Sequence, residues 1–140
     1  PMDDIFCGTS IFVTGASGFV GKSVLFNQIR RNFPKRLRKV VVVEGDITED
    51  YFGMSYKNLI RVLEETSVVF HCAAAVRFNE RLKKAANHNM SGVRRMIKLC
   101  HWMPNLKAFL HCATAYVNAD KPGQKIAEKL SETKLDAHKL

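Results

Sequence analysis

Three glycines at intervals of three residues, Gly15, Gly18 and Gly21, lie between a short apolar run at 10–13 and an amphipathic segment. An apolar run followed by an amphipathic segment predicts a strand, a tight turn and a helix. Glycine allows a positive φ at the first position, close backbone approach to a pyrophosphate at the second, and helix packing on the strand at the third. The helix start would favour a bound diphosphate. The residues expected at this phosphate site are Thr14, Gly15, Ser17, Gly18, Phe19, Val20 and Gly21.

The rest of the chain alternates between short apolar runs and amphipathic stretches. Strands are expected at 10–14, 39–44, 67–73 and 106–112, and helices at 19–32, 56–65 and 79–102. This alternation favours an α/β fold with a parallel, Rossmann-like sheet and helices on both faces. Ligands of such sheets bind beyond the carboxyl ends of the strands, so the strand ends should locate the site.

Two of the other strand ends carry residues suited to a nucleotide. Asp46 and Ile47 follow the run at 39–44, and the Asp46 carboxylate could accept a hydrogen from an adenine amino group. Ala73 and Ala74 follow the run at 67–73, where small residues allow either a nucleotide to lie against the backbone or a helix to pack closely. Thr114 follows the last strand and places a hydroxyl at the same edge of the sheet.

The charge of the chain is strongly positive, with 22 Lys and Arg against 13 Asp and Glu and a net charge of +9. Solvated helix faces and loops account for most of this excess, and a phosphorylated cofactor or substrate would use part of it. Basic residues do not alternate with aromatic ones, as they do where bases are stacked, so no nucleic-acid partner is expected.

Composition indicates one globular domain over residues 1–140, with 46% hydrophobic residues. No apolar run approaches the ~20 residues that span a bilayer, so the chain is expected to be soluble and cytosol-facing. The four cysteines form no C-x-x-C pair, which favours reduced thiols. No metal site is expected, because the two candidate pairs at 71–72 and 111–112 each point to opposite faces of a strand.

Four runs make the comparison with known families specific: T-G-A-S-G-F-V-G-K, V-E-G-D-I-T, V-V-F-H-C-A-A-A-V-R-F-N-E and L-K-A-F-L-H-C-A-T-A-Y-V-N. In this order they resemble the amino-terminal domain of the alcohol-forming fatty acyl-CoA reductases of animals and insects, members of the extended short-chain dehydrogenase/reductase superfamily. The resemblance implies lipid biosynthesis: NADPH reduces a long-chain fatty acyl-CoA through an aldehyde to a fatty alcohol, a wax precursor. It also implies a location at peroxisomal or endoplasmic-reticulum membranes.

The same resemblance assigns roles to individual residues. It implies that the three glycines approach the pyrophosphate of NADP(H), or alternatively of NAD, that Asp46 and Ile47 meet the adenine, and that Ala73 and Ala74 line the cofactor. Thr114 would be the hydroxyl of a Ser/Thr–Tyr–Lys triad and would hold the carbonyl oxygen as negative charge develops on it.

Two departures from the family pattern concern activity and cofactor preference. The chain contains no Y-x-x-x-K pair to protonate the alkoxide, because Tyr51, Tyr56 and Tyr116 are followed four residues later by Ser55, Ile60 and Asp120. An inactive fragment of the reductase is therefore expected. The alternative is a non-catalytic domain that binds a nucleotide or a partner.

The second departure is a β-unit that is missing between the first helix and the strand at 39–44. That strand could slide into the gap, in which case Glu44 would approach a ribose hydroxyl and favour NAD. Arg36 and Arg38 could instead be drawn to a 2′-phosphate and favour NADPH. An incomplete sheet with a poorly packed tail at 121–140 predicts an open edge and self-association.

Overall fold

Three short parallel strands form the centre of the fold: β1 (Ile11–Thr14), β2 (Val68–His71) and β3 (Ala108–His111). They lie in the order β1-β2-β3, and Thr14, His71 and His111 are in register at their carboxyl ends. The structure is a computed structural model that describes residues 7–77, 79–118, 121, 123 and 125–129. The expected strands near 10–14, 67–73 and 106–112 are confirmed.

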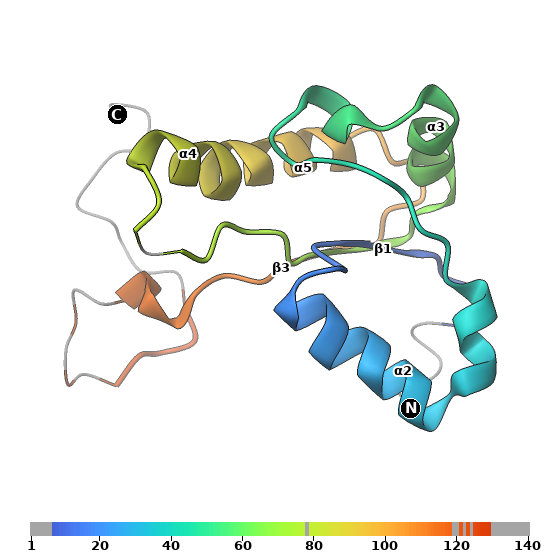
Figure 1. Ribbon diagram of the computed structural model, residues 1–140, viewed down its shortest axis with the longest axis horizontal. Helices are drawn as coiled ribbons and strands as arrows, with labels where there is room; N and C mark the ends of the chain where they lie inside the picture. Colours follow the sequence, from blue (N-terminus) through green and yellow to red (C-terminus); the bar gives the residue numbers. More distant parts are fainter. Residues whose placement is uncertain (1–6, 78, 119–120, 122, 124, 130–140) are drawn as a thin grey trace.

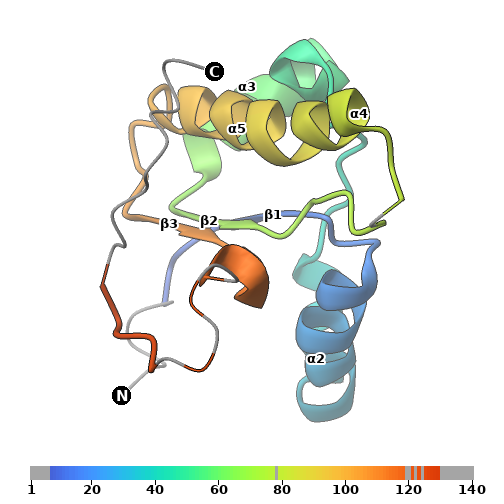
Figure 2. The ribbon, with the colours of Figure 1, turned by 90° about the vertical axis from the view of Figure 1, so that its left-hand side faces the viewer.

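Helices cover both faces of this sheet (Figure 2). One face carries α3 (Tyr56–Glu65), α4 (Leu82–Ala86) and α5 (Gly92–Cys100), and the other carries α2 (Asn27–Asn32). The predicted α/β class with a parallel sheet is confirmed. Before α2 the chain is already helical, in the wider π-turns of η1 (Gly21–Phe26). The helix expected at 19–32 is therefore present, and α3 occupies the predicted range 56–65.

The helix between β2 and β3 is continuous from Leu82 to Cys100 and widens in the middle. A π-helical stretch, η4 (Asn87–Ser91), joins α4 to α5. Such insertions are frequent at functional sites because they redirect side chains without ending the helix. The bend expected near 87–92 corresponds to this stretch.

The hydrophobic core lies between the sheet and the face that α3 and α5 cover. Val69 and Met96 are fully buried, and Leu99 and Val62 are nearly so. Phe12 and Phe109 stand in register with Val69 on the neighbouring strands and pack against the same cluster. Removing this apolar surface from water is the main stabilising contribution to the three-stranded sheet.

The strand expected at 39–44 does not form, so the prediction that it slides beside β1 is wrong. Residues 34–39 form a short helix, η2 (Pro34–Lys39), and residues 40–46 have no regular structure. Within the described chain, they make no backbone hydrogen bond to β1. Figure 2 shows this segment passing the outer side of β1 from the α2 layer to the α3 layer. A strand is stable only where a neighbour accepts its hydrogen bonds, and a segment that runs across the edge meets none.

Two single-turn helices complete the described elements, η3 (Asp50–Gly53) and η5 (Ala115–Asn118). Most of the tail at 121–140 lies outside the described residues, so its expected poor packing stays a prediction. Among the described helices, none combines the length and the apolar character needed to cross a bilayer.

We expect the chain to self-associate through the outer edge of β3, because that edge has no partner strand in the described chain and Leu110 is 45% exposed. The mass measured by light scattering after size exclusion should rise with concentration. Leu110→Lys should lower that mass, whereas Val76→Lys, at an exposed position outside the sheet, should leave it unchanged. A monomer at every concentration with ordinary cooperative unfolding would contradict this expectation.

Candidate functional site

The glycine turn is pressed against the end of β2. Gly15 has φ 70°, and a Cβ built on it would lie 2.7 Å from the backbone nitrogen of Ala73. Both facts exclude a side chain at this position. The Gly18 N–H donates to the Gly15 carbonyl at 3.0 Å and closes the turn. The turn thus has the positive φ that the spacing predicts at Gly15, and the close approach at this position is to the backbone of Ala73.

The other two glycines differ in what surrounds them. A Cβ at Gly21 would lie 2.5 Å from the Ala16 Cα, so Gly21 lets the helix pack on the turn itself rather than on the strand. A Cβ at Gly18 would meet only the Gly15 carbonyl oxygen, at 3.2 Å. Gly18 and its neighbours Ser17 and Phe19 are exposed. Space beside Gly18 therefore remains open to a ligand.

A buried hydrogen bond joins β1 to β2 directly below the turn. The Thr14 hydroxyl lies 2.7 Å from Nδ1 of His71 and also accepts the N–H of Ala73 at 3.3 Å. His71 is fully buried and its ring stacks on that of His111, with 5.4 Å between centroids. Burial, with a smaller contribution from His111, lowers the pKa of His71 to about 4, so the ring is neutral at pH 7.

The segment after β2 is fixed by a side chain from the π-turns of η4. The Asn89 amide donates to the Ala75 carbonyl at 3.0 Å, and its oxygen accepts the Ala75 N–H at 2.8 Å. This pairing satisfies both backbone groups of an irregular segment and holds Ala73 and Ala74 beside the glycine turn. Sequence patterns identified Asn89 only as part of a possible bend.

The expected adenine contacts, Asp46 and Ile47, lie in a tight loop that precedes η3. The Asp46 carboxylate accepts the Thr48 N–H at 2.8 Å and the Thr48 hydroxyl at 2.7 Å through the same oxygen, Oδ1. These bonds lower the pKa of Asp46 and keep it ionised. Oδ2 has no hydrogen-bond partner within the described residues and could accept from a ligand.

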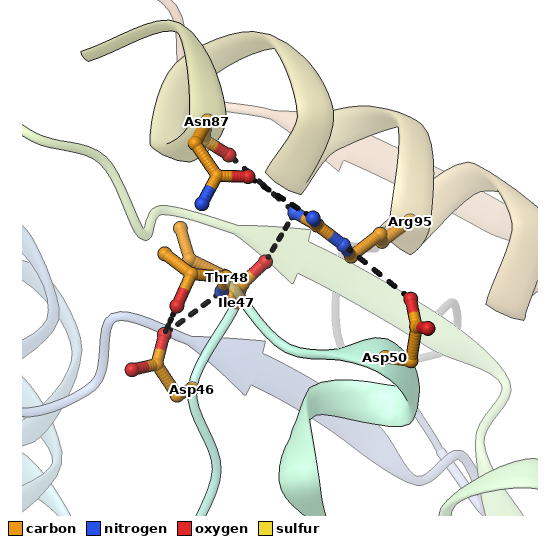
Figure 3. A network of polar contacts seen from close by, with 6 residues as sticks. All are labelled: Asp46, Ile47, Thr48, Asp50, Asn87 and Arg95. Carbon is orange, nitrogen blue, oxygen red and sulfur yellow. Dashed lines mark hydrogen bonds and ion pairs between the residues drawn. The ribbon is translucent and has the colours of Figure 1, made fainter. Parts of the chain in front are cut away.

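Arg95 of α5 clamps this loop to the helix (Figure 3). Its guanidinium donates to the Ile47 carbonyl at 3.2 Å and to the Asn87 side-chain oxygen at 3.0 Å, and a longer ion pair of 3.8 Å reaches Asp50. Gly92 allows the contact, because a Cβ there would meet the Ile47 side chain at 3.2 Å. One side chain thus connects the loop, η4 and α5.

The next turn of the same loop is strained and held by burial. Tyr51 and Phe52 have φ of 51° and 59°, values that non-glycine residues adopt at a cost of about 1–3 kcal/mol each. Phe52 is 3% exposed in the core, and Tyr51 stacks on Trp102 with 5.6 Å between centroids. These contacts offset the strain and fix the position of the loop.

Thr114 follows β3 at the same edge of the sheet but on the strand farthest from the glycine turn. Its hydroxyl accepts the Tyr116 N–H at 3.2 Å, which begins the turn of η5. Figure 2 shows η5 on the same side of the sheet as α2. Both Thr114 and Tyr116 are exposed, so the hydroxyl can be reached from solvent.

The basic residues Arg36 and Arg38 lie away from this edge. The chain is helical from 19 to 32, so η2 begins about 20 Å beyond the glycine turn, toward the other end of the sheet (Figure 1). A contact between these arginines and a 2′-phosphate held at the turn is therefore not favoured. Across the described residues, no three His, Cys, Asp or Glu side chains gather as a metal site requires.

Comparison with known families agrees with this geometry. The sequence model of the NAD-binding domain described as the male sterility protein matches residues 22–140. The chain belongs to this family. The family match begins at residue 22, just after Gly21 of the glycine turn. The turn itself lies within an alignment to a relative that covers all 140 residues of this chain.

Those relatives are fatty acyl-CoA reductases by name. A Drosophila melanogaster protein provisionally named a fatty acyl-CoA reductase is 31% identical over the whole chain and 34% of its own length. Fatty acyl-CoA reductase 1 of Mus musculus and fatty acyl-CoA reductase 2 of Homo sapiens are each 28% identical over 81% of the chain and 29% of their own length. The chain thus spans about a third of the relatives it matches.

The Drosophila alignment extends over 178 positions, whereas the chain has 140 residues. Because the whole chain is aligned, the extra positions are residues of the relative that lie between aligned residues of this chain. It is large enough for one strand–helix unit, since a complete βαβ unit takes about 30 residues.

A solved structure shows the same fold. The terminal R domain of the myxalamid biosynthetic pathway superimposes with a TM-score of 0.61 and 23% identity, over 78% of this chain and 36% of that domain.

We expect the stability of the chain to fall between about pH 6.5 and pH 4 because of His71. Its pKa is about 4 when folded and near 6.5 when unfolded, so only the unfolded chain binds a proton in this range. The free energy of unfolding should be constant above this range and lower by about 3 kcal/mol at its acidic end. Urea unfolding at several pH values measures this.

Two variants isolate the effect. His71→Asn should remove most of the slope between these pH values. His101→Asn, at an exposed position, should preserve it. Equal slopes in both variants would assign the pH dependence to other groups.

Proposed function

We propose that this chain is the NADP(H)-binding part of a reductase that converts long-chain fatty acyl-CoA into fatty alcohol. The observation that carries the proposal is the turn between β1 and η1, where Gly15 holds the backbone against β2 and leaves Gly18 exposed at a helix start. Membership of an NAD-binding family and relatives named fatty acyl-CoA reductases support it. The whole protein would act at peroxisomal or endoplasmic-reticulum membranes, by the same resemblance.

The residues around the turn suit a dinucleotide. A diphosphate would meet the backbone beside Gly18 and the positive end of the following helix. The adenine would approach Asp46, whose Oδ2 is available as an acceptor, and the hydrophobic side chain of Ile47. Ala73 and Ala74 would face the cofactor without crowding it. NADPH would supply the hydride, and NAD remains the alternative cofactor because no cation of η2 lies near the turn.

Catalysis by the chain alone is not part of the proposal. Thr114 could donate a hydrogen bond to the carbonyl oxygen of an acyl substrate, but a Tyr and Lys pair to protonate the product is absent from the sequence. Loss of general acid catalysis typically costs ~10²–10⁴-fold in rate. The absent pair favours a second reading of this chain, as a non-catalytic domain that binds the nucleotide.

The test of the proposal is cofactor binding by a variant that fills the space beside Gly18. Gly18→Val should abolish NADPH binding, measured by titration calorimetry, because the new side chain blocks backbone approach to the pyrophosphate. A Cβ at position 18 would meet only the Gly15 carbonyl oxygen, at 3.2 Å, and the φ of Gly18 is not positive, so a side chain there requires that oxygen to shift by a few tenths of an ångström. Circular dichroism of the variant checks that it folds.

A matched variant and a second ligand complete this test. Ala127→Val, at an exposed position near the end of the described residues, adds the same side chain elsewhere and should leave binding intact. Titration with NADH establishes which cofactor binds more tightly. Unchanged affinity in a folded Gly18→Val variant would place the nucleotide elsewhere.

We also expect Arg95 to act as a positioning residue for the adenine side of the site. Arg95→Gln removes the bond to the Ile47 carbonyl and should weaken NADPH binding about tenfold, since a charged hydrogen bond contributes about 1.5–3 kcal/mol. Amide exchange at 46–52 should accelerate in the free protein. Arg94→Gln, on the exposed side of α5, is the control and should change neither. Weaker binding without faster exchange would argue against positioning.

A further inference from the structure

The end of α2 and the residues that follow carry the most basic surface of the described chain. This surface, the basic end of α2, consists of Arg30, Arg31, Lys35, Arg36, Arg38 and Lys39 together with Phe33 and Val40–Val42. All six cationic residues are exposed. None has an ion-pair partner within the described residues, and the sequence has no Asp or Glu between Asp4 and Glu44.

Apolar side chains lie exposed among these charges. Phe33 is 49% exposed, Val41 55% and Val42 85%. The Arg36 guanidinium stands over the Phe33 ring at 4.3 Å from its centroid. A soluble domain rarely leaves consecutive apolar residues in water unless something covers them. Because residues 40–46 form no strand, the sheet does not cover these side chains.

The nucleotide site does not use this surface. The helix that begins at the glycine turn carries the cluster away from the carboxyl ends of the strands and toward the opposite end of the sheet (Figure 1). The charges are also too many for one phosphate. Together with the exposed apolar side chains, these charges suit a ligand that carries negative charge over an extended area and has an apolar layer below that charge.

We propose that the basic end of α2 docks on an anionic lipid bilayer. Clusters of four to eight Lys and Arg beside a helix are attracted to acidic headgroups, and each contributes about 1 kcal/mol near such a surface. The exposed valines and Phe33 would enter the boundary between headgroups and acyl chains. Nucleic acid is the less suitable ligand, because Phe33 is the one aromatic residue in the surface and Arg36 already covers one face of its ring. The proposal is independent of nucleotide binding.

Vesicle binding by the 140-residue chain tests the proposal. We expect the chain to sediment with vesicles of phosphatidylcholine and phosphatidylserine, less so as salt increases, and much less with phosphatidylcholine alone. The triple variant Arg36→Gln, Arg38→Gln, Lys39→Gln should lower the partition coefficient on the order of a hundredfold. The control Lys57→Gln, Lys83→Gln, Arg94→Gln removes the same charge from exposed positions on other helices and should lower it far less.

A second pair of variants tests the apolar contribution without changing the charge. Val42→Ser should weaken vesicle binding, and Val76→Ser, similarly exposed in the loop after β2, should not. Equal losses in the two triple variants would overturn the proposal, as would equal binding to neutral vesicles. Tighter binding to a single-stranded RNA oligonucleotide than to the acidic vesicles would also overturn it.

Discussion

The carboxyl end of β2 is the constraint on which the candidate site depends. β2 is the central strand, so its position is fixed from both edges, and the elements of the site are fastened to it. The glycine turn rests on the backbone of Ala73, the Thr14 hydroxyl reaches His71, and Asn89 pairs with Ala75. The Thr14–His71 hydrogen bond is buried and the Asn89–Ala75 pair is exposed; both join neutral groups, so they hold geometry without attracting counterions. A displacement of this strand end would displace the glycine turn and the segment at 73–75 together.

Charge is handled differently in the two halves of the molecule. Around the strand ends, Arg95 is paired with Asn87, the Ile47 carbonyl and Asp50, and one carboxylate oxygen of Asp46 accepts from Thr48. At the far end of α2, six cations face water without acidic partners among the described residues. The paired charge of Arg95 positions a loop. The unpaired charges at the end of α2 create a positive potential in the solvent, which attracts a large anionic partner. The positive net charge of the sequence is thus mostly a property of places other than the proposed nucleotide site.

Local patterns predicted most of the fold but not the long-range hydrogen bonds around the candidate site. The strand–turn–helix at 10–32 and the helix at 56–65 depend on periodicity and on glycine, which are visible within a short window. The prediction of a strand at 39–44 was wrong because four consecutive valines favour extended backbone, but a strand also needs a neighbouring strand to accept its hydrogen bonds. His71, Asn89 and Arg95 were missed as site residues because their bonds join positions 57, 14 and 48 residues apart. Local sequence patterns cannot predict which residues so far apart in the chain will form hydrogen bonds.

The segment at 40–46 has a consequence for how this fold accommodates changes in length. It joins the two helical layers along the outer edge of β1 and contributes no strand to the sheet, so the three remaining strands keep their register without it. Connections of this kind tolerate insertion well where Val43 keeps its contact with the core, because added residues cost little loop-closure entropy. A strand–helix unit inserted between Lys39 and Asp46 could therefore pair with the outer edge of β1, which has no partner strand among the described residues.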